Sequence, residues 1–294
     1  MKLSSVLVLT CLVLPLSAAS AQSSTVTAQG FTIGDQGLKY AAITEGGLHP
    51  RIIALNSIQN GDVASGIHLE ASVLGGGSAD YGTLGGTVTS QVRNQSKFNN
   101  SYTPRAEGIL TMSFLDSGIV TSKTQAAGAP VTLSFVASLA SDYFTSGVRG
   151  NGKNGANNSF DGFVQDQTTL VKNGMFIGNG IAGTTPSTVL FTLNTTVGHT
   201  VTLSGLLEIS ASSYIDGLPD ALGGDVSATS SALAAHTAHF YLQPTDDLSL
   251  VTASGHDYAI PTVPETATTV SFGLLLLLGG GGMVVSGRRR RRIS

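Results

Sequence analysis

The sequence has few charges, one cysteine and no tryptophan. Cys11 is the only cysteine in 294 residues and lies in an apolar run near the start. A chain that lost this run would have neither a disulfide nor a thiol nucleophile. Charged residues make up 11% of the chain and apolar residues 41%. That apolar share suffices for a hydrophobic core, so the composition excludes a disordered protein despite 37 glycines.

The charges are unevenly distributed along the chain. Between Gln22 and Pro264 there are 9 basic and 17 acidic residues, a net charge of −8, whereas five arginines stand together close to the last residue. Affinity for nucleic acid comes mainly from basic side chains that neutralise phosphates. An acidic body without a basic stripe therefore argues against nucleic acid as a partner.

Residues 1–21 have the pattern of a secretory signal peptide. Lys2 precedes an apolar run from Val6 to Leu16, and the small-residue triplet Ala19-Ser20-Ala21 follows. A buried helix would instead show polar residues at a helical period. We expect signal peptidase to cut between Ala21 and Gln22 and the rest of the chain to be exported.

Residues 263–294 combine a short motif, an apolar segment and a basic cluster. The motif Val263-Pro264-Glu265-Thr266 stands before an expected transmembrane helix at about 270–286. The basic cluster that follows consists of Arg288, Arg289, Arg290, Arg291 and Arg292. By the positive-inside rule these arginines stay in the cytoplasm, which agrees with export of the body.

This arrangement resembles the PEP-CTERM sorting signal of Gram-negative bacteria. The usual motif is Val-Pro-Glu-Pro, which Val263, Pro264 and Glu265 match, while Thr266 replaces the second proline. The resemblance implies transient anchoring by the C-terminal helix, cutting at the motif by an integral-membrane exosortase, and delivery to the cell surface. Two alternatives remain open: a sortase-type wall signal, because Pro264-Glu265-Thr266 is similar to part of Leu-Pro-x-Thr-Gly, and a plain tail anchor.

Residues 22–262 alternate apolar and polar side chains with a period of two, which is typical of strands. The clearest stretches are 86–92, 130–139, 188–193, 199–209, 238–242 and 248–252. We expect roughly ten short strands in a single all-β domain, an antiparallel β-sandwich or jelly roll. Gly75–Gly77 and Gly150–Gly155 are interpreted as connections, and Asp161–Ile181 as a short helix or long loop.

The body is also similar to secreted proteins that carry such sorting signals. The resemblance rests on Phe114–Ser122 followed by Ala127–Phe135, and on His236–Pro244 leading to Ser254–Tyr258. It implies an exported β-sandwich whose first pair of segments forms strand, turn and strand. It implies no reaction.

Candidate chemistry within the body is sparse. His236 and His239 would point to opposite faces of a strand, so they do not predict a zinc site. Asp246 and Asp247 are weak calcium candidates, together with the acidic residues of a nearby loop-rich stretch, Asp216, Asp220 and Asp225. The glycine spacing at 150–155 lacks the strand and helix that a nucleotide site needs. We therefore expect no catalytic residue and no cofactor, with calcium as the alternative.

Together with the resemblance to the PEP-CTERM signal, these patterns lead us to expect an exported cell-surface or matrix protein with a structural or adhesive role in the exopolysaccharide layer. Its expected partners are signal peptidase, an exosortase-type protease and exopolysaccharide. The alternative is a secreted jelly roll that binds or cleaves glycans. Cleavage would need two carboxylates, of which Glu208, amid apolar neighbours, is the best acid candidate. Binding would need exposed aromatic rings, and the chain has only 7 Tyr and 11 Phe.

Overall fold

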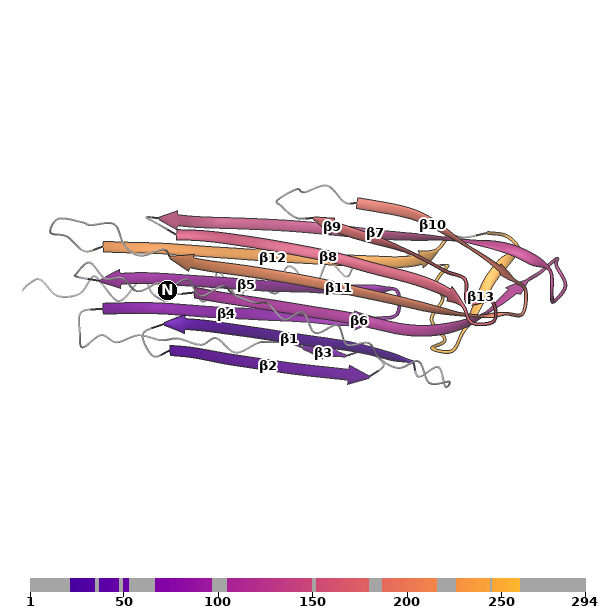
Figure 1. Ribbon diagram of the computed structural model, residues 1–294, viewed down its shortest axis with the longest axis horizontal. Coiled ribbons are helices and arrows are strands. Elements are labelled where there is room, and N and C mark those ends of the chain that lie inside the picture. The colour runs from indigo at the N-terminus through magenta and orange to yellow at the C-terminus, as the bar shows by residue number, and fades with distance from the viewer. Residues whose placement is uncertain are drawn as a thin grey trace, which may run out of the picture.

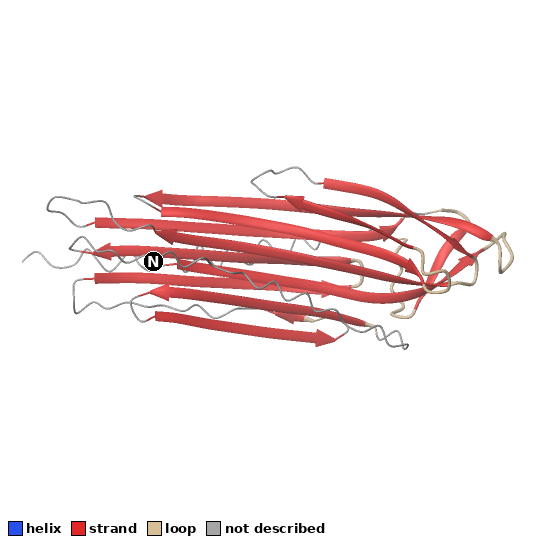
Figure 2. Ribbon diagram, viewed as in Figure 1, coloured by secondary structure: helices blue, strands red, loops and turns tan. Residues whose placement is uncertain are grey.

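The computed structural model describes residues 22–34, 37–47, 50–52, 67–96, 105–149, 152–179, 187–215, 226–243 and 245–259. Within these ranges every regular element is a strand (Figure 2). The strands are β1 (Ser23–Gly34), β2 (Gly37–Gly47), β3 (Arg51–Ile52), β4 (Ile67–Asp80), β5 (Thr83–Ser96), β6 (Arg105–Ser122), β7 (Pro130–Arg149), β8 (Gly152–Asp166), β9 (Lys172–Asn179), β10 (Ser187–Thr196), β11 (Thr200–Ile215), β12 (Val226–Leu242) and β13 (Leu248–Thr252). The prediction of an all-β protein is confirmed.

The strands form two antiparallel sheets packed face to face, a β-sandwich (Figure 1). Sheet A has the order β2-β1-β6-β11-β8-β9, with β13 paired to the last part of β6. Sheet B has the order β10-β7-β12-β5-β4-β3. The sandwich is elongated because its strands are long: β7, with 20 residues, spans roughly 65 Å at about 3.3 Å per residue.

The core lies between the sheets and follows the predicted alternation. On β7 the residues Val131, Leu133, Phe135, Ala137 and Leu139 are all buried. On β11 the inward positions from Val201 to Ile209 are buried, while Leu206 and Glu208 are exposed. Because side chains of a strand alternate between two faces, this pattern fixes which face of each sheet meets the core.

Aromatic rings from both sheets meet in the part of the core that lies near β13. Phe240 of β12 lies 5.6 Å from Phe135 and 5.8 Å from Phe114, measured between ring centroids. Phe191 of β10 lies 5.7 Å from Phe135. Such pairs add to the stability that burial alone gives.

Glycines allow the two sheets to approach closely at the other end of the core. A Cβ atom on Gly108 of β6 would lie 2.5 Å from Val73 and 2.7 Å from Val88 on sheet B. A Cβ atom on Gly86 of β5 would lie 2.3 Å from Leu110 on sheet A. Any larger side chain at these positions would have to push the sheets apart or displace their core residues.

Three predicted non-strand segments are strands in the structure. Gly75–Gly77 lies inside β4, where it pairs with β5, rather than in a connection. Residues 152–155 begin β8, and most of Asp161–Ile181 belongs to β8 and β9. The long neighbouring strands explain this difference. β11 pairs with β8 from the partners Val201 and Asp166 to the partners Ile215 and Gly152. The backbone groups of β11 therefore hold β8 in the sheet although its residues have a weak local preference for strands.

The two predicted targeting segments, 1–21 and 263–294, lie outside the described residues. No helix in the described part of the chain has the length and apolar character to cross a membrane. The predicted strand, turn and strand at Phe114–Phe135 is confirmed, but β6 and β7 lie in different sheets. The connection at 123–129 therefore joins the two layers instead of closing a hairpin.

Candidate functional site

The predicted processing residues lie at or beyond the limits of the described body. Gln22 is its first residue, whereas Ala21 precedes it. Val263, Pro264, Glu265, Thr266 and the five arginines from Arg288 to Arg292 all follow its last residue, Ala259. What the structure shows of their surroundings is where the first and last described residues of the body lie.

The body begins and ends toward the same end of the sandwich. Ser23, at the start of β1, is the register partner of Leu115 on β6. β13 pairs with Gly118–Ser122 of β6, and the Ala253 amide donates a hydrogen bond to the Ser117 carbonyl at 2.8 Å. We call this region the junction end; it comprises Leu115–Ser122 of β6, β13 and residues 253–259. In Figure 1 it is the end at which β13 lies.

Asp116 holds the last described segment in the core at the junction end. Its buried carboxylate accepts hydrogen bonds from the Ser254 amide at 3.2 Å, from the Ser254 hydroxyl, and from the Tyr258 hydroxyl at 3.3 Å. Tyr258 is 1% exposed, and its carbonyl accepts a hydrogen bond from the Leu242 amide at 2.8 Å. Burial, followed by the negative charge of Asp116, raises the pKa of Tyr258 above its ordinary value. The buried Tyr258 ring thus anchors the end of the described body in the core, and in this sense closes the body, only a few residues before the predicted cutting site.

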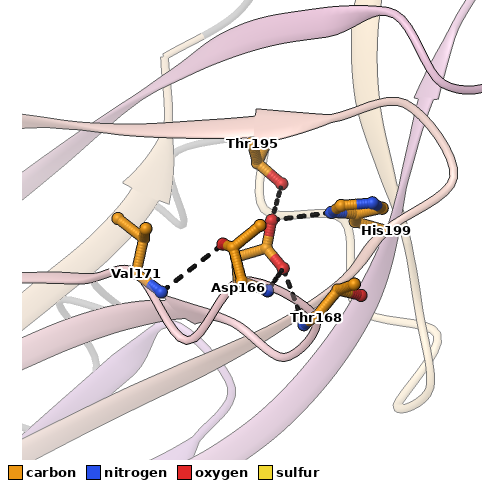
Figure 3. Close-up of polar contacts among 6 residues, drawn as sticks. Asp166, Thr168, Val171, Thr195 and His199 are labelled. Carbon is orange, nitrogen blue, oxygen red and sulfur yellow. Dashed lines mark hydrogen bonds and ion pairs between the residues drawn. The ribbon is translucent and has the colours of Figure 1, made fainter.

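A second buried carboxylate, Asp166, organises the turn between β8 and β9 (Figure 3). Its Oδ1 accepts hydrogen bonds from the amides of Thr168 at 2.8 Å and Thr169 at 3.0 Å. Its Oδ2 accepts one from the Thr195 hydroxyl at 2.6 Å and lies 2.8 Å from Nδ1 of His199. These contacts join the β8–β9 turn of sheet A to the end of β10 in sheet B and to the connection that follows β10.

The charge state of Asp166 follows from these contacts. Burial alone would raise the pKa of Asp166, but the hydrogen bonds from Thr195, His199 and the two amides outweigh it and lower that pKa well below its usual range. Asp166 is therefore ionised at neutral pH. Because two of its donors lie in the turn of sheet A and the other two lie at the end of β10 and just after it, the arrangement is suited to holding the two sheets together. Sequence reasoning did not single out this cluster, whose members come from three separate segments.

A cavity of about 480 Å³ lies beside this cluster. Its wall includes Thr195, Thr169 and Val171 from the cluster and its turn, together with Pro130 and Thr132 of β7. Leu170, in the same turn, is 67% exposed and has a φ of 60°, a left-handed conformation that bulky residues rarely adopt. The surrounding hydrogen bonds, including that from the Leu170 amide to the Asp166 carbonyl at 2.9 Å, hold it there.

The calcium candidates differ in their surroundings. Asp247 Oδ1 accepts hydrogen bonds from the Ser122 hydroxyl at 2.7 Å and from the amides of Lys123 and Thr124, both at 2.9 Å. These bonds, with that of Ser122 first, lower the pKa of Asp247. Asp246 is exposed. Asp216, Asp220 and Asp225 lie outside the described residues, and within those residues no three acidic, His or Cys side chains gather as metal ligands. Calcium binding at Asp246 and Asp247 stays an untested alternative to the expectation of no cofactor.

The other candidates lie apart from one another. His239 stands between the inward-facing Ala238 and Phe240 on β12, and burial lowers its pKa. The side chain of His236 lies outside what the structure describes. Glu208 is exposed on the outer face of sheet A. The structure therefore brings neither His239 nor Glu208 into the clusters around Asp116 and Asp166.

Comparison with known proteins gives no family. No protein-family model and no curated protein matches the chain. Among solved structures, a chain of the infectious bursal disease virus Gx strain aligns over 89% of this chain and 72% of its own, with 10% identity and a TM-score of 0.20. The VP2 subviral particle of infectious bursal disease virus aligns over 89% and 73%, with 12% identity and a TM-score of 0.16. Likenesses this weak carry no argument about fold or function.

Proposed function

We propose that this chain is an exported protein of the cell surface or extracellular matrix, sorted by an exosortase-type membrane protease. Its role is structural or adhesive, within or on the exopolysaccharide layer. Signal peptidase removes residues 1–21, and the segment 263–294 anchors the chain transiently with its arginines in the cytoplasm. The protease then cuts at the motif around Val263-Pro264-Glu265 and releases the body.

The observation that carries this proposal is the shape of the body and the position of its ends. The body is a long sandwich that begins and ends toward one end. A chain tethered there extends its length away from the membrane. From Leu115, the partner of Ser23, β6 runs back ten residues to Arg105, which is about 33 Å at the usual rise per residue. A body of this form suits a spacer or an adhesive arm.

The closure of the body by Tyr258 also supports the proposal. Only three residues separate Ala259 from Val263, so at most about 14 Å of chain joins the folded body to the motif. This short spacer suits a cut next to the membrane surface. It is less suited to wall anchoring, in which a long spacer has to cross the cell wall.

The test is the intact mass of the protein released from a Gram-negative host that carries an exosortase. We expect a released species that begins at Gln22 and lacks Arg288–Arg292, and we expect its loss when the exosortase gene is deleted. Pro264→Ala should leave the chain in the membrane fraction, whereas Thr266→Pro, which restores the usual motif, should be released at least as well as the wild type. A released species that retains the arginines would overturn the sorting proposal, and release that survives the deletion would favour a different protease.

Carbohydrate binding is a second candidate function, and one specific observation favours it. Although aromatic residues are few, several of them lie on the outer face of sheet A, where the core does not require them. Their arrangement also indicates a particular class of glycan.

A further inference from the structure

Aromatic and cationic side chains gather at one end of the outer face of sheet A. Phe31 of β1 and Tyr40 of β2 are register partners. Arg105 of β6 is the register partner of Tyr214 on β11, which in turn pairs with Lys153 of β8. We call these five residues the far-end platform, because they lie at the end of sheet A opposite the junction end, where β6 begins and β11 ends (Figure 1).

The platform faces away from the core. Thr32, Ala106 and Ser213, the chain neighbours of platform residues, are buried, so the alternation of each strand turns Phe31, Arg105 and Tyr214 outward. Tyr40 is 61% exposed and Arg105 is 45% exposed. Rings in such positions do little for the stability of the sandwich, which already buries its aromatic cluster between the sheets.

The cations are held over the rings. The Arg105 guanidinium carbon lies 5.4 Å from the centroid of Phe31, and Lys153 Nζ lies 5.5 Å from the centroid of Tyr214. Both distances are within the range of cation–π attraction. Arg105 also pairs with Glu107 at 2.7 Å, and Glu107 is the register partner of Phe31. Two cations beside one carboxylate give the platform a local positive charge on a body whose net charge is −8.

We propose that the far-end platform binds an acidic polysaccharide. The C–H faces of sugar rings stack on Tyr40, Phe31 and Tyr214, while Arg105 and Lys153 receive the carboxylates of the same chain. From β2 to β8 the platform crosses four strand spacings, roughly 19 Å, which accommodates several linked sugar units. This assignment names the ligand class of the exported protein proposed above and rests on that proposal for its extracellular setting.

The platform favours a saccharide over a nucleic acid. Nucleic acids gain affinity from many phosphate contacts, and two cations on an acidic body supply few of them. A sugar chain gains affinity from ring stacking and from hydrogen bonds to hydroxyl groups, such as that of the neighbouring Ser212, the register partner of Glu107. The position also fits, because a platform at the end opposite the tether points toward the surrounding matrix.

The experiment measures binding of the full-length purified chain to sodium alginate, a polyuronate, with dextran as the neutral polysaccharide and a single-stranded oligonucleotide as the other polyanion. We expect salt-sensitive binding to alginate and much weaker binding to the other two. Tyr40→Ala and Lys153→Gln should each weaken alginate binding about fivefold, as expected for loss of one stacking or cation–π contact of about 1 kcal/mol.

The matched control is Lys172→Gln on the same face. Lys172 is exposed, and its Nζ lies 3.7 Å from the centroid of Phe163, so it forms the same kind of contact outside the platform. It should leave alginate binding unchanged, and all variants should keep the unfolding midpoint of the wild type. Absence of alginate binding, equal binding of dextran or oligonucleotide, or an equal loss in Lys172→Gln would each overturn the assignment. Because the assay uses purified protein, its outcome is independent of whether the sorting proposal holds.

Discussion

Replacing Asp166 by alanine is the sharpest test of how the two sheets are joined at the junction end. The substitution removes the acceptor for the Thr195 hydroxyl, the amides of Thr168 and Thr169, and the ring nitrogen of His199. Thr195 is buried, whereas Thr168 and Thr169 are exposed and their amides can bond to water instead. A buried donor left without an acceptor costs about 1–3 kcal/mol, and bonds to a charged acceptor are the stronger kind. Thr195 accounts for about 1–3 kcal/mol and the bond of His199 to the charged carboxylate for about 1.5–3 kcal/mol, so we expect Asp166→Ala to lower the free energy of unfolding by about 3–5 kcal/mol.

Asp166→Asn removes the negative charge of the side chain but keeps its shape. The asparagine oxygen can still accept from the two backbone amides, and its NH₂ group can donate to Thr195 and His199 once the hydroxyl rotates and the ring changes tautomer. We expect a smaller loss, about 1–2 kcal/mol. The matched control is Asp161→Asn, an exposed position on the same strand, which should stay within about 0.5 kcal/mol of the wild type. Urea unfolding of the full chain measures all three, provided that the slope m is unchanged.

The pH dependence gives an independent check with a definite sign. The pKa of Asp166 is lower in the folded state than in the unfolded chain, so its ionisation stabilises the fold above the unfolded pKa of about 4. This contribution falls as the pH drops below about 4, because the unfolded chain then takes up the proton first. The wild type should lose stability between about pH 5 and pH 2 more steeply than Asp166→Ala. A loss below about 1 kcal/mol in Asp166→Ala at pH 7, or identical pH profiles, would refute this account.

Two further predictions concern packing and closure of the body. A Cβ atom on Gly77 would lie 2.8 Å from Met112 and 2.9 Å from Leu110, whereas one on Gly75 would make only ordinary contacts at 3.6 Å. We therefore expect Gly77→Ala to lower the free energy of unfolding by about 1–3 kcal/mol in the same urea titration. Gly75→Ala should be neutral or slightly stabilising. Tyr258→Phe should lower the free energy of unfolding by about 1 kcal/mol, because it removes the hydrogen bond to Asp116. Tyr258→Ala should lower it by about 3–5 kcal/mol and should speed proteolysis after residue 252. Equal losses of stability in the two variants would contradict the role of the buried Tyr258 ring.

The alternation of side chains predicted much of the fold because burial on one face leaves a period of two in the sequence. Val88, Ser90 and Val92 share the buried face of β5, and Ala238, Phe240 and Leu242 share that of β12, as the sequence indicated. The length of the strands was underestimated. Glycines and asparagines interrupt the apolar pattern in β4 and β8, and local preference there favours turns. The paired neighbours β5 and β11 extend past these residues and keep them in the sheet.

The Asp166 cluster could be predicted only in part. An aspartate followed by Thr168 and Thr169 is a known pattern for a turn in which the side chain caps nearby amides. Thr195 lies at the end of β10 and His199 in the connection that follows it, and no local spacing relates either residue to Asp166. Their meeting depends on the register of β8 with β11 and on the position of β10, which are set by tertiary pairing.

The far-end platform also depends on strand pairing that the sequence does not reveal, and it changes what the small number of aromatic residues implies. By count alone, few rings argue against a glycan surface, since most aromatic residues are needed in the core. The pairing of β2, β1, β6 and β11 nevertheless places Tyr40, Phe31 and Tyr214 on one face, although 174 positions separate Tyr40 from Tyr214 in the sequence. The same strand β6 carries Arg105 at the far end and Asp116 at the junction end. One long strand thus keeps the proposed binding surface away from the tether, and lengthening or shortening the sandwich would change the reach of the binding surface without changing its chemistry.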